Sequence, residues 1–483
     1  MNREQRLAAR YGAGHSRLAI YARIMDNAMN QLDIPAARRE DFLHWAMGNL
    51  WKNYEQELMD KRKVIENEIR NLGIRLPNGT VKKEYHASFE LPVDRVSNVE
   101  LQGLSDLGLG FDADENGKFT VSGKPAKAGD FTLRLTFDTV EGAGRSELTI
   151  PIAFNPDPRS LWKEIETDKN IAYYKPDSES EYVKVEAGAD GLPKKDIVAA
   201  SKRGRSHAQE GKARDDHFKL FHCKDSDWYI IAVADGAGSA KFSRKGSEVA
   251  CNTVVDHCKA KLLNNPEFEN AIIAYHGDRQ NQEKRSALTT MVYDIVLRGA
   301  VNAHEAINQA SANSDFETKP KDFATTLMFA ICKKFEFGWF IASFWVGDGA
   351  ICLYDAKEGT AKLLGVPDEG EFSGQTRFLT MPEIFRDKAA VYNRLKMTIV
   401  DDFTALFLMT DGVSDPMFET EKNLNDFGKW QEFYEKLKTG FPEDDIPGVD
   451  LTDDNIDAKD QLLRWLDFWS PGNHDDRTIA ILY

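Results

Sequence analysis

Three apolar runs of the sequence end in an Asp-Gly pair, and this recurrence constrains the fold more than any other feature. The runs are YIIAVADGAG, ASFWVGDGA and ALFLMTDGVSD, and their acids are Asp235, Asp348 and Asp411. Short apolar runs bounded by turn residues are typical of buried strands. A lone Asp after a strand is often a turn former or a helix N-cap. Because the acid recurs, we instead expect several carboxylates to converge at the ends of core strands.

Converging carboxylates are stable only when cations lie between them. Two such charges about 4 Å apart repel by about 4 kcal/mol at an effective dielectric constant near 20. Ligand sets made only of oxygen favour Mg²⁺, Mn²⁺ or Ca²⁺ over zinc. The glycine after the acid lets the backbone approach an ion, so the Gly236 carbonyl is a further candidate ligand. Two such ions about 3.5–4 Å apart suit the hydrolysis of phosphate esters.

The composition is that of a soluble protein. With 483 residues the chain is too long for one ordinary core and is expected to form two or three domains. A net charge of −16 argues against general binding to nucleic acid or to an anionic membrane. No apolar run approaches the roughly 20 residues that span a bilayer, and the N-terminus lacks the pattern of a signal peptide. The five cysteines have no metal-site spacing, which favours a reducing, cytoplasmic location.

The pattern of apolar residues changes along the chain and predicts a multidomain α+β protein. Apolar residues over 43–72 fall at helical spacing, which predicts a helical region over 1–75. We interpret this region as a helical hairpin, with a partner-binding coiled coil as the alternative. Short alternating runs predict a small antiparallel β-sandwich over 80–155. The polar stretch 156–191 is interpreted as a linker, and 192–483 is long enough for one large domain.

The predicted β-sandwich resembles the bacterial immunoglobulin-like domain family. The stretch LGLGFDADENGKFTVSGKPAKAGDFTLRLTF has a cadence of acids, glycines and aromatic residues similar to that family. Such domains are usually spacers or binding modules. The resemblance therefore implies that the N-terminal modules bind a protein partner or hold the rest of the chain at a distance.

The acid-tipped runs belong to an ordered set of motifs in the last part of the chain. These motifs are SKRGRSHAQEGKARDDH (201–217), VADGAGSAKFSRKGSEVA (233–250), FATTLMFAI (323–331), GEFSGQTRFLT (370–380), LMTDGVSDPM (408–417) and WSPGNHDDRTIAIL (469–482). In this order they resemble the metal-dependent protein phosphatase family, type 2C. The first motif is similar to that of a bacterial subgroup, Ser-x-x-Gly-x-Ser-His-x-x-x-Gly-x-x-Cys-Gln-Asp.

The resemblance implies an αββα sandwich, in which helices flank two antiparallel β-sheets, with a dinuclear Mn²⁺ or Mg²⁺ centre at one end. By position in the motifs, Asp235 would bridge both metals and Gly236 would offer its carbonyl. Asp411 and Asp475 would hold the other ion, and Asp216 would lie in the same cluster. The nucleophile implied by the family is a metal-bound hydroxide.

Other positions match the family less directly. Asp348 and Asp415 match acids that some members use for a third, weaker ion. His207 is in register with the subgroup's histidine, and it is either a catalytic acid beside Asp235, Asp411 and Asp475 or an ordinary turn histidine. At the last motif the family commonly has Asp-Asn, so Asp475 takes the ligand role and Asp476 replaces the Asn.

Two departures from the family pattern concern the first motif. The subgroup's Cys-Gln is here Arg214-Asp215, which would add an acid beside the metals and change their affinity. Many members carry a phosphate-binding arginine five residues before the motif's last acid, and here that position is Gly211. Arg205, Arg214 and His207 are the candidates to replace that arginine, and the sequence leaves the choice open.

These observations predict a cytoplasmic, metal-dependent serine/threonine phosphoprotein phosphatase. Its substrate would be a phosphorylated protein, and a kinase is a candidate partner. Two alternatives stay open: a catalytically inactive adaptor that binds phosphoproteins, and a phosphatase of small metabolites. Retention of Asp235, Asp411 and Asp475 argues against the adaptor, because an adaptor needs no cluster of charges.

Overall fold

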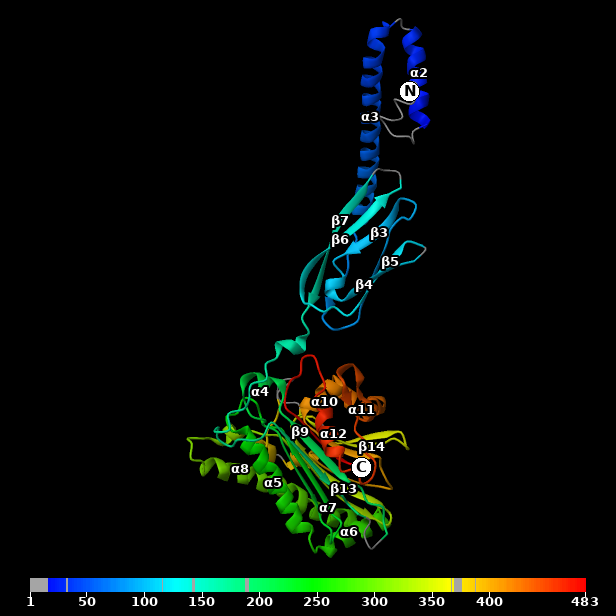
Figure 1. Cartoon of the computed structure of the whole chain (residues 1–483). Coiled ribbons are helices and arrows are strands. Elements are labelled where there is room, and N and C mark those ends of the chain that lie inside the picture. Colours follow the sequence, from blue (N-terminus) through cyan, green and yellow to red (C-terminus); the bar gives the residue numbers. More distant parts are fainter. Residues whose placement is uncertain are drawn as a thin grey trace. The chain divides into compact units, whose positions relative to one another are not determined.

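The structure is a computed structural model that describes residues 16–31, 34–114, 116–140, 144–186, 191–365, 367–368, 376–386 and 388–483, without the side chains of 16–22, 26, 388 and 389. The chain divides into two compact units, residues 1–161 and 162–483. Each unit is described by itself below (Figure 1). Within the described residues, no helix combines the length and the apolar character needed to span a bilayer.

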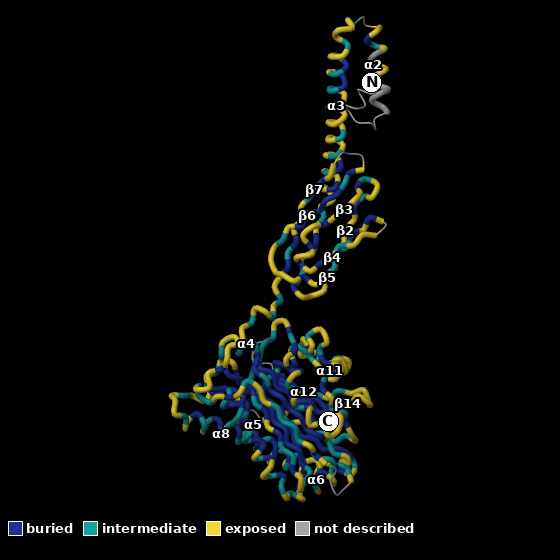
Figure 2. Tube along the Cα trace, viewed as in Figure 1, coloured by how far each residue is buried: buried dark blue, intermediate teal, exposed yellow. Residues whose placement is uncertain are grey.

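Unit 1 begins with a helical hairpin, α2 (Ser16–Gln31) and α3 (Ala36–Asn71), which lie side by side (Figure 1). The predicted apolar stripe of α3 is buried only at its two ends. Its N-terminal part buries Leu43 and Met47, and its C-terminal part buries Ile65 and Ile69 in the core of the β-sheets. Between them Tyr54 is 54% exposed, and Figure 2 shows exposed residues along the middle of α3 in yellow. The stripe therefore serves two separate packing contacts rather than one.

The rest of unit 1 is formed by two sheets that share one core. One sheet has the order β2-β5-β4 and the other has the order β1-β7-β6-β3. The strands are β1 (Gly79–Thr80), β2 (Tyr85–Glu90), β3 (Val96–Gln102), β4 (Leu109–Ala113), β5 (Lys118–Gly123), β6 (Gly129–Thr139) and β7 (Arg145–Asn155). Alternate residues of β2 are buried and exposed, as expected for a strand with one face on a core. The two-sheet arrangement agrees with the alternating sequence pattern, and the immunoglobulin-like assignment stays a prediction.

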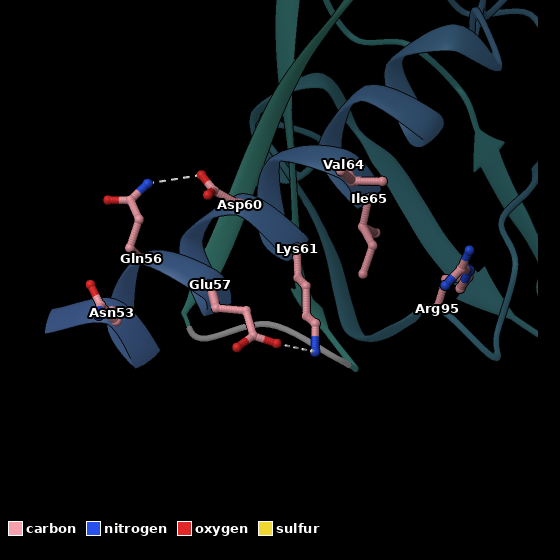
Figure 3. A pocket seen from close by; sticks show the side chains of 8 residues that line it. All are labelled: Asn53, Gln56, Glu57, Asp60, Lys61, Val64, Ile65 and Arg95. Atoms are coloured by element: carbon pink, nitrogen blue, oxygen red, sulfur yellow. Dashed lines mark hydrogen bonds and ion pairs between the residues drawn. The ribbon is translucent and has the colours of Figure 1, made fainter. Parts of the chain in front are cut away.

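A pocket of about 440 Å³ lies beside α3 in unit 1 (Figure 3). Its charged side chains have partners: Lys61 forms an ion pair with Glu57, Asp60 accepts a hydrogen bond from Gln56, and Arg95 forms an ion pair with Glu68. No like charges gather in this lining, so the pocket offers no reason to place chemistry here.

Unit 2 contains two large antiparallel sheets packed face to face. The five-stranded sheet has the order β10-β11-β12-β13-β16, and the six-stranded sheet has the order β15-β14-β17-β20-β9-β8. Apolar side chains such as Ile231, Ile341 and Leu408 fill the space between them. The strands are β8 (Ser178–Val183), β9 (Ile197–Lys202), β10 (His217–His222), β11 (Tyr229–Ala234), β12 (Leu327–Phe335), β13 (Gly338–Val346), β14 (Ala350–Asp355), β15 (Thr360–Gly365), β16 (Leu395–Val400), β17 (Ala405–Met409) and β20 (Arg477–Leu482), with a small pair β18 (Gly440–Phe441) and β19 (Ile446–Pro447).

Helices cover the outer face of each sheet. Val254 of α5 and Ile272 of α6 join the core over the five-stranded sheet, and Trp430 of α11 and Trp465 of α12 join the core over the six-stranded sheet. The helices are α4 (Arg205–Glu210), α5 (Ser243–Leu262), α6 (Pro266–Gly277), α7 (Gln282–Val292), a π-helical turn (Tyr293–Leu297), α8 (Arg298–Ala312), α9 (Lys388–Asn393), α10 (Asp411–Phe418), α11 (Phe427–Thr439) and α12 (Ala458–Trp465). The predicted α+β class is thus confirmed, with helices outside two packed sheets.

Most of the stretch interpreted as a linker, 156–191, belongs to unit 2, which begins at Trp162. Strand β8 pairs with β9 at the edge of the six-stranded sheet. Thr167 and Lys175 are buried although both are polar. We name residues 162–177, which precede β8, the strap. The linker prediction is wrong here because an edge strand and this hydrogen-bonded strap need few apolar residues. Residues 187–190 lie outside the described part of the chain.

Candidate metal centre

Strand β11 is buried along its whole length and delivers Asp235 at its end. The carbonyl oxygen of Asp235 accepts hydrogen bonds from Thr325 Oγ1 (2.7 Å) and Thr326 N (2.8 Å), and its N–H donates to Thr326 Oγ1 (2.8 Å). A Cβ on Gly236 would lie 2.6 Å from the Asp215 carbonyl oxygen, so only glycine fits there. Backbone contacts on both sides thus hold the Asp235 position.

Acids from both sheets meet beside Asp235. Asp348 follows β13, and Asp411 follows β17 as the first residue of α10. Carboxylate oxygens of Asp235, Asp348 and Asp411 lie within 4.8 Å of one another, and we name these three residues the carboxylate cluster. Within the described residues, Asp348 Oδ1 and Asp411 Oδ1 are buried and accept no hydrogen bond. Buried oxygens without a donor are costly unless another positive partner is present.

Asp216 lies against this cluster and is fully buried. Its Oδ2 accepts hydrogen bonds from Thr478 Oγ1 (2.7 Å) and Thr410 Oγ1 (3.0 Å), and its charge helps to raise the pKa of Asp235. Its Oδ1 has no partner among the described residues. One oxygen of Asp216 is therefore hydrogen-bonded and the other remains available to an ion.

The charges of the cluster are unfavourable without a counter-charge. Burial, followed by the repulsion of Asp411 on Asp235 and of Asp348 on Asp411, raises the pKa of both residues well above the usual range. Burial and Asp476 raise the pKa of Asp216 to about 7. Burial and Asp348 raise the pKa of Asp415 to about 6. Either protons or cations must accompany these acids at neutral pH.

A second group, His207, Asp475 and Asp476, also has its ligand atoms within 4.8 Å of one another, and we name it the histidine cluster. Here Asp476 Oδ1 accepts from Gly204 N (2.6 Å) and contacts His207 Nδ1 (3.0 Å), and its Oδ2 accepts from Asp215 N (2.5 Å). Burial opposes the charge of Asp476, but His207 and these N–H groups outweigh it and lower its pKa. Asp476 is thus held as an ionised, fully bonded carboxylate.

The other two members of the histidine cluster behave differently. Burial opposes the charge of His207, but Asp476 and Asp215 outweigh it and raise the pKa of His207 to about 9. Burial and Asp476 raise the pKa of Asp475, whose Oδ1 accepts the N–H of Asp476 (2.8 Å). Asp475 is therefore the acid of the final pair with coordination capacity left.

The carboxylate of Asp215 does not join the carboxylate cluster by any contact of the described residues. Its Oδ1 lies 3.2 Å from Arg244 Nε, and its Oδ2 lies 3.8 Å from His207 Nε2. Its backbone lies against Gly236. Asp215 thus stands between two cationic side chains beside the acids.

The two arginines expected to bind phosphate have other partners. Arg214 is fully buried, donates to the Pro176 carbonyl and pairs with Glu179 at 2.8 Å. Arg205 donates to the Asp467 and Phe468 carbonyls and lies over the Trp469 ring. The acceptors described for these two guanidinium groups thus lie on β8, on the segment before it and on the loop before β20.

Sequence reasoning missed two basic residues near the acids. Arg244 lies in the second motif, at the first turn of α5. Its positive charge close to Asp235 in the sequence could have marked it as a candidate. Lys175 lies in the stretch interpreted as a linker, and its Nζ donates to the Asp216 carbonyl (3.1 Å) and Ser247 Oγ (2.9 Å). No local pattern marks Lys175, because both acceptors are distant in sequence.

The residues present fit divalent cations. The available donors are carboxylate oxygens and the Gly236 carbonyl, without sulfur, and several of the buried oxygens have no protein donor among the described residues. Such oxygen-only sets favour Mg²⁺ or Mn²⁺. Asp235, Asp411, Asp216 and Asp475 would hold the main ions, while Asp348 and Asp415 extend the acidic surface.

Comparison with known proteins agrees with these features. The family model described as Protein phosphatase 2C matches residues 203–466. No curated protein matches the chain. Among solved structures, a bacterial serine phosphatase is 13% identical, with 59% of this chain and 96% of that chain covered and a TM-score of 0.34. The catalytic domain of the serine/threonine protein phosphatase PstP with 2 manganese ions is 17% identical, with coverage of 63% and 98% and a TM-score of 0.32. A serine/threonine phosphatase of S. agalactiae is 14% identical, with coverage of 63% and 99% and a TM-score of 0.31.

Proposed function

The chain belongs to the protein phosphatase 2C family, and we propose that it is an active, metal-dependent phosphatase of phosphoserine and phosphothreonine in proteins. One observation carries the proposal. Asp216, Asp348 and Asp411 each keep a buried carboxylate oxygen without a donor among the described residues. A chain that only bound phosphoproteins would gain nothing from this repulsion, whereas an enzyme gains a place for two cations.

The proposed ligands follow from the family motifs and from the buried oxygens of Asp216 and Asp411 that lack a donor among the described residues. Asp235, the Gly236 carbonyl, Asp411, Asp475 and Asp216 would together hold two ions. Asp348 and Asp415 would hold a third, weaker ion. When bound, the cations supply a water of lowered pKa and neutralise the phosphate oxygens. Mn²⁺ and Mg²⁺ are both compatible with these oxygens.

His207 is proposed as the general acid. Asp476 can only accept at neutral pH, so Nδ1–H of His207 donates to Asp476 Oδ1 (3.0 Å), which leaves Nε2 to carry the second proton. A pKa of about 9 keeps that proton in place at neutral pH. A proton delivered from Nε2 to the leaving serine or threonine oxygen would assist cleavage of the ester bond.

Unit 1 is proposed to bind the phosphorylated protein or another protein partner, such as a kinase. Trp45 (65%), Trp51 (42%) and Tyr54 (54%) are exposed on α3, and aromatic side chains of this kind are common in protein interfaces. A pull-down with unit 1 fused to an inert carrier tests this role against a fusion with Trp51→Ala and Tyr54→Ala. Equal capture by both would contradict it.

The experiment for the enzymatic role is hydrolysis of phosphoserine and phosphothreonine peptides by the full-length protein. We expect activity with Mn²⁺ or Mg²⁺ and none with a chelator. Asp235→Asn should be inactive, whereas Asp256→Asn, a change of an exposed acid on α5, should match the wild type. Activity on small phosphate esters but on no phosphopeptide would favour the metabolite phosphatase. Phosphopeptide binding without hydrolysis at any metal concentration would favour the adaptor.

A further inference from the structure

The position that would carry a phosphate-binding arginine in many related proteins cannot do so in this chain. Gly211 occupies it with a φ of +68°, a conformation that L side chains rarely adopt, and an added Cβ would lie 3.0 Å from Ile165 Cγ2. Arg214 pairs with Glu179 and donates to the Pro176 carbonyl, although its Nη1 has no acceptor among the described residues, and Arg205 donates to the Phe468 carbonyl. A phosphate dianion beside several carboxylates nevertheless needs a cationic side chain in addition to the ions.

The start of α5, which carries Arg244, lies against Gly236, a candidate ligand through its carbonyl. A Cβ on Gly236 would be 2.9 Å from Asp215 Cβ and 3.0 Å from the Ser243 carbonyl carbon, so the start of α5 and Asp215 both lie against the residue after Asp235. The Arg244 side chain is only 12% exposed and its Nη1 donates to the Ala172 carbonyl (3.1 Å). The strap before β8 thus holds the guanidinium on this side of the acids.

The contact between Arg244 and Asp215 is incomplete. Arg244 Nε lies 3.2 Å from Asp215 Oδ1, yet both atoms are buried and neither completes a hydrogen bond among the described residues. A buried guanidinium donor without an acceptor is unfavourable unless a ligand oxygen supplies one. Phosphate oxygens match the planar donor edge of arginine.

Asp215 relates this arginine to His207. Its second oxygen lies 3.8 Å from His207 Nε2, the nitrogen proposed to deliver a proton. One carboxylate therefore lies between both cationic groups. This gives a physical reason for an acid where the subgroup has glutamine.

We propose that Arg244 binds the substrate phosphate and that Asp215 positions Arg244 for this contact. The inference rests on the proposed function, but it concerns phosphate binding and can be tested without turnover. Arg244 would contact the substrate directly, whereas Asp215 would act through Arg244.

The test measures binding of inorganic phosphate to the full-length, Mn²⁺-loaded protein by calorimetry, together with KM and kcat for an aryl phosphate. Arg244→Ala should weaken phosphate binding and raise KM by on the order of 10- to 100-fold, the loss of a charge-assisted hydrogen bond, with a smaller effect on kcat. The phosphate affinity and KM of Arg244→Lys should lie between those of the wild type and of Arg244→Ala, because lysine keeps the charge without the planar donor edge. Asp215→Asn should raise KM several-fold with little change in kcat.

The matched control is Lys245→Ala, because Lys245 lies on the same turn of α5 but pairs with Glu248 at 3.0 Å. It should leave phosphate binding unchanged, which separates a specific contact from a loss of net charge. Titration of Mn²⁺ binding and the melting temperature report whether each variant is folded and loaded. If Arg244→Ala does not fold, the decision passes to Arg244→Lys.

The outcomes separate the inference from the proposed function. Unchanged phosphate affinity in the folded Arg244 variants overturns the inference, even when the wild type is active. Absence of phosphate binding by the Mn²⁺-loaded wild type overturns it as well. Phosphate binding that depends on Arg244 in a protein without phosphatase activity supports the inference and contradicts the proposed function.

Discussion

The carboxylate cluster and the histidine cluster both contain buried aspartates, but these aspartates differ in their hydrogen bonds and in the direction of their pKa shifts. In the carboxylate cluster, Asp348 Oδ1 and Asp411 Oδ1 lack a donor among the described residues, and burial and like charges raise the pKa of Asp411. In the histidine cluster, Asp476 accepts from two backbone N–H groups, contacts His207, and has a lowered pKa. Hydrogen-bond partners, rather than residue type, separate proposed ion ligands from acids that hold the fold together.

The neighbours Asp475 and Asp476 illustrate the difference within one dipeptide. Both carboxylate oxygens of Asp476 accept hydrogen bonds, from the N–H groups of Gly204 and Asp215, and Oδ1 also contacts His207. Within the described residues, Asp475 accepts one backbone hydrogen bond, at Oδ1, and it has a raised pKa. The comparison supports the register in which Asp475 is the ligand, and four experiments can break or sharpen it.

The largest effect is expected from removing the strap that supports both clusters. Ile165 N donates to the Ala208 carbonyl in the helix that carries His207, and Lys175 Nζ donates to the Asp216 carbonyl. A chain beginning at residue 188 lacks these contacts and strand β8. We expect it to be insoluble or inactive, whereas a chain beginning at Trp162 should fold and hydrolyse a small phosphate ester. If the two chains have equal melting temperatures and activities, the strap does not support the two clusters.

Asp235→Asn should separate activity from stability. Removing the proposed bridging charge should lower turnover of an aryl phosphate at least about 100-fold. The same change should raise the melting temperature of the metal-free protein, because burial and like charges disfavour the ionised Asp235. Calorimetry in the presence of a chelator measures the second effect. A variant that is both inactive and less stable without metal would place Asp235 among the structural acids.

Asp476→Asn should have the opposite signature. Gly204 N and Asp215 N donate to different oxygens of Asp476, and an amide has only one oxygen to offer. One buried N–H would lose its acceptor, at a cost of about 1–3 kcal/mol of unfolding free energy with or without metal. Urea denaturation measures it, with Asp256→Asn as the control. Stability equal to that of the wild type would mean that the family's Asn is accommodated here after all.

His207→Gln should change the pH dependence of stability within the histidine cluster. The pKa of His207 is raised to about 9 in the folded protein, above the value of about 6.5 expected in the unfolded chain. Its contribution is therefore fully present below about pH 6.5 and is lost as the pH rises through about 9. The stability difference between wild type and variant should shrink over this range by about 3 kcal/mol. A difference that stays constant would show that the pKa of His207 is the same in the folded and the unfolded protein.

Much of the fold of unit 2 could be predicted because its signals are local. The runs that end at Asp235, Asp348 and Asp411 form the expected strands β11, β13 and β17, and each acid lies just after its strand. The stripe of α3 was predicted as one face, yet two cores divide it, since periodicity shows which side is apolar and not what covers it. Residues 370–375 of the fourth motif lie outside the described part of the chain.

The sequence by itself determined the order of the motifs, the acids at the strand ends and the glycine that must follow Asp235. These follow from the spacing of apolar and turn residues along a few neighbouring positions. Only the tertiary structure decided which acids keep unused oxygens and which cations face them. Asp476 meets the N–H of Gly204, 272 residues away, and Lys175 meets the carbonyl of Asp216, 41 residues away. Such residues become partners only when strands of two sheets and the polar strap pack together. A local sequence pattern does not indicate that packing.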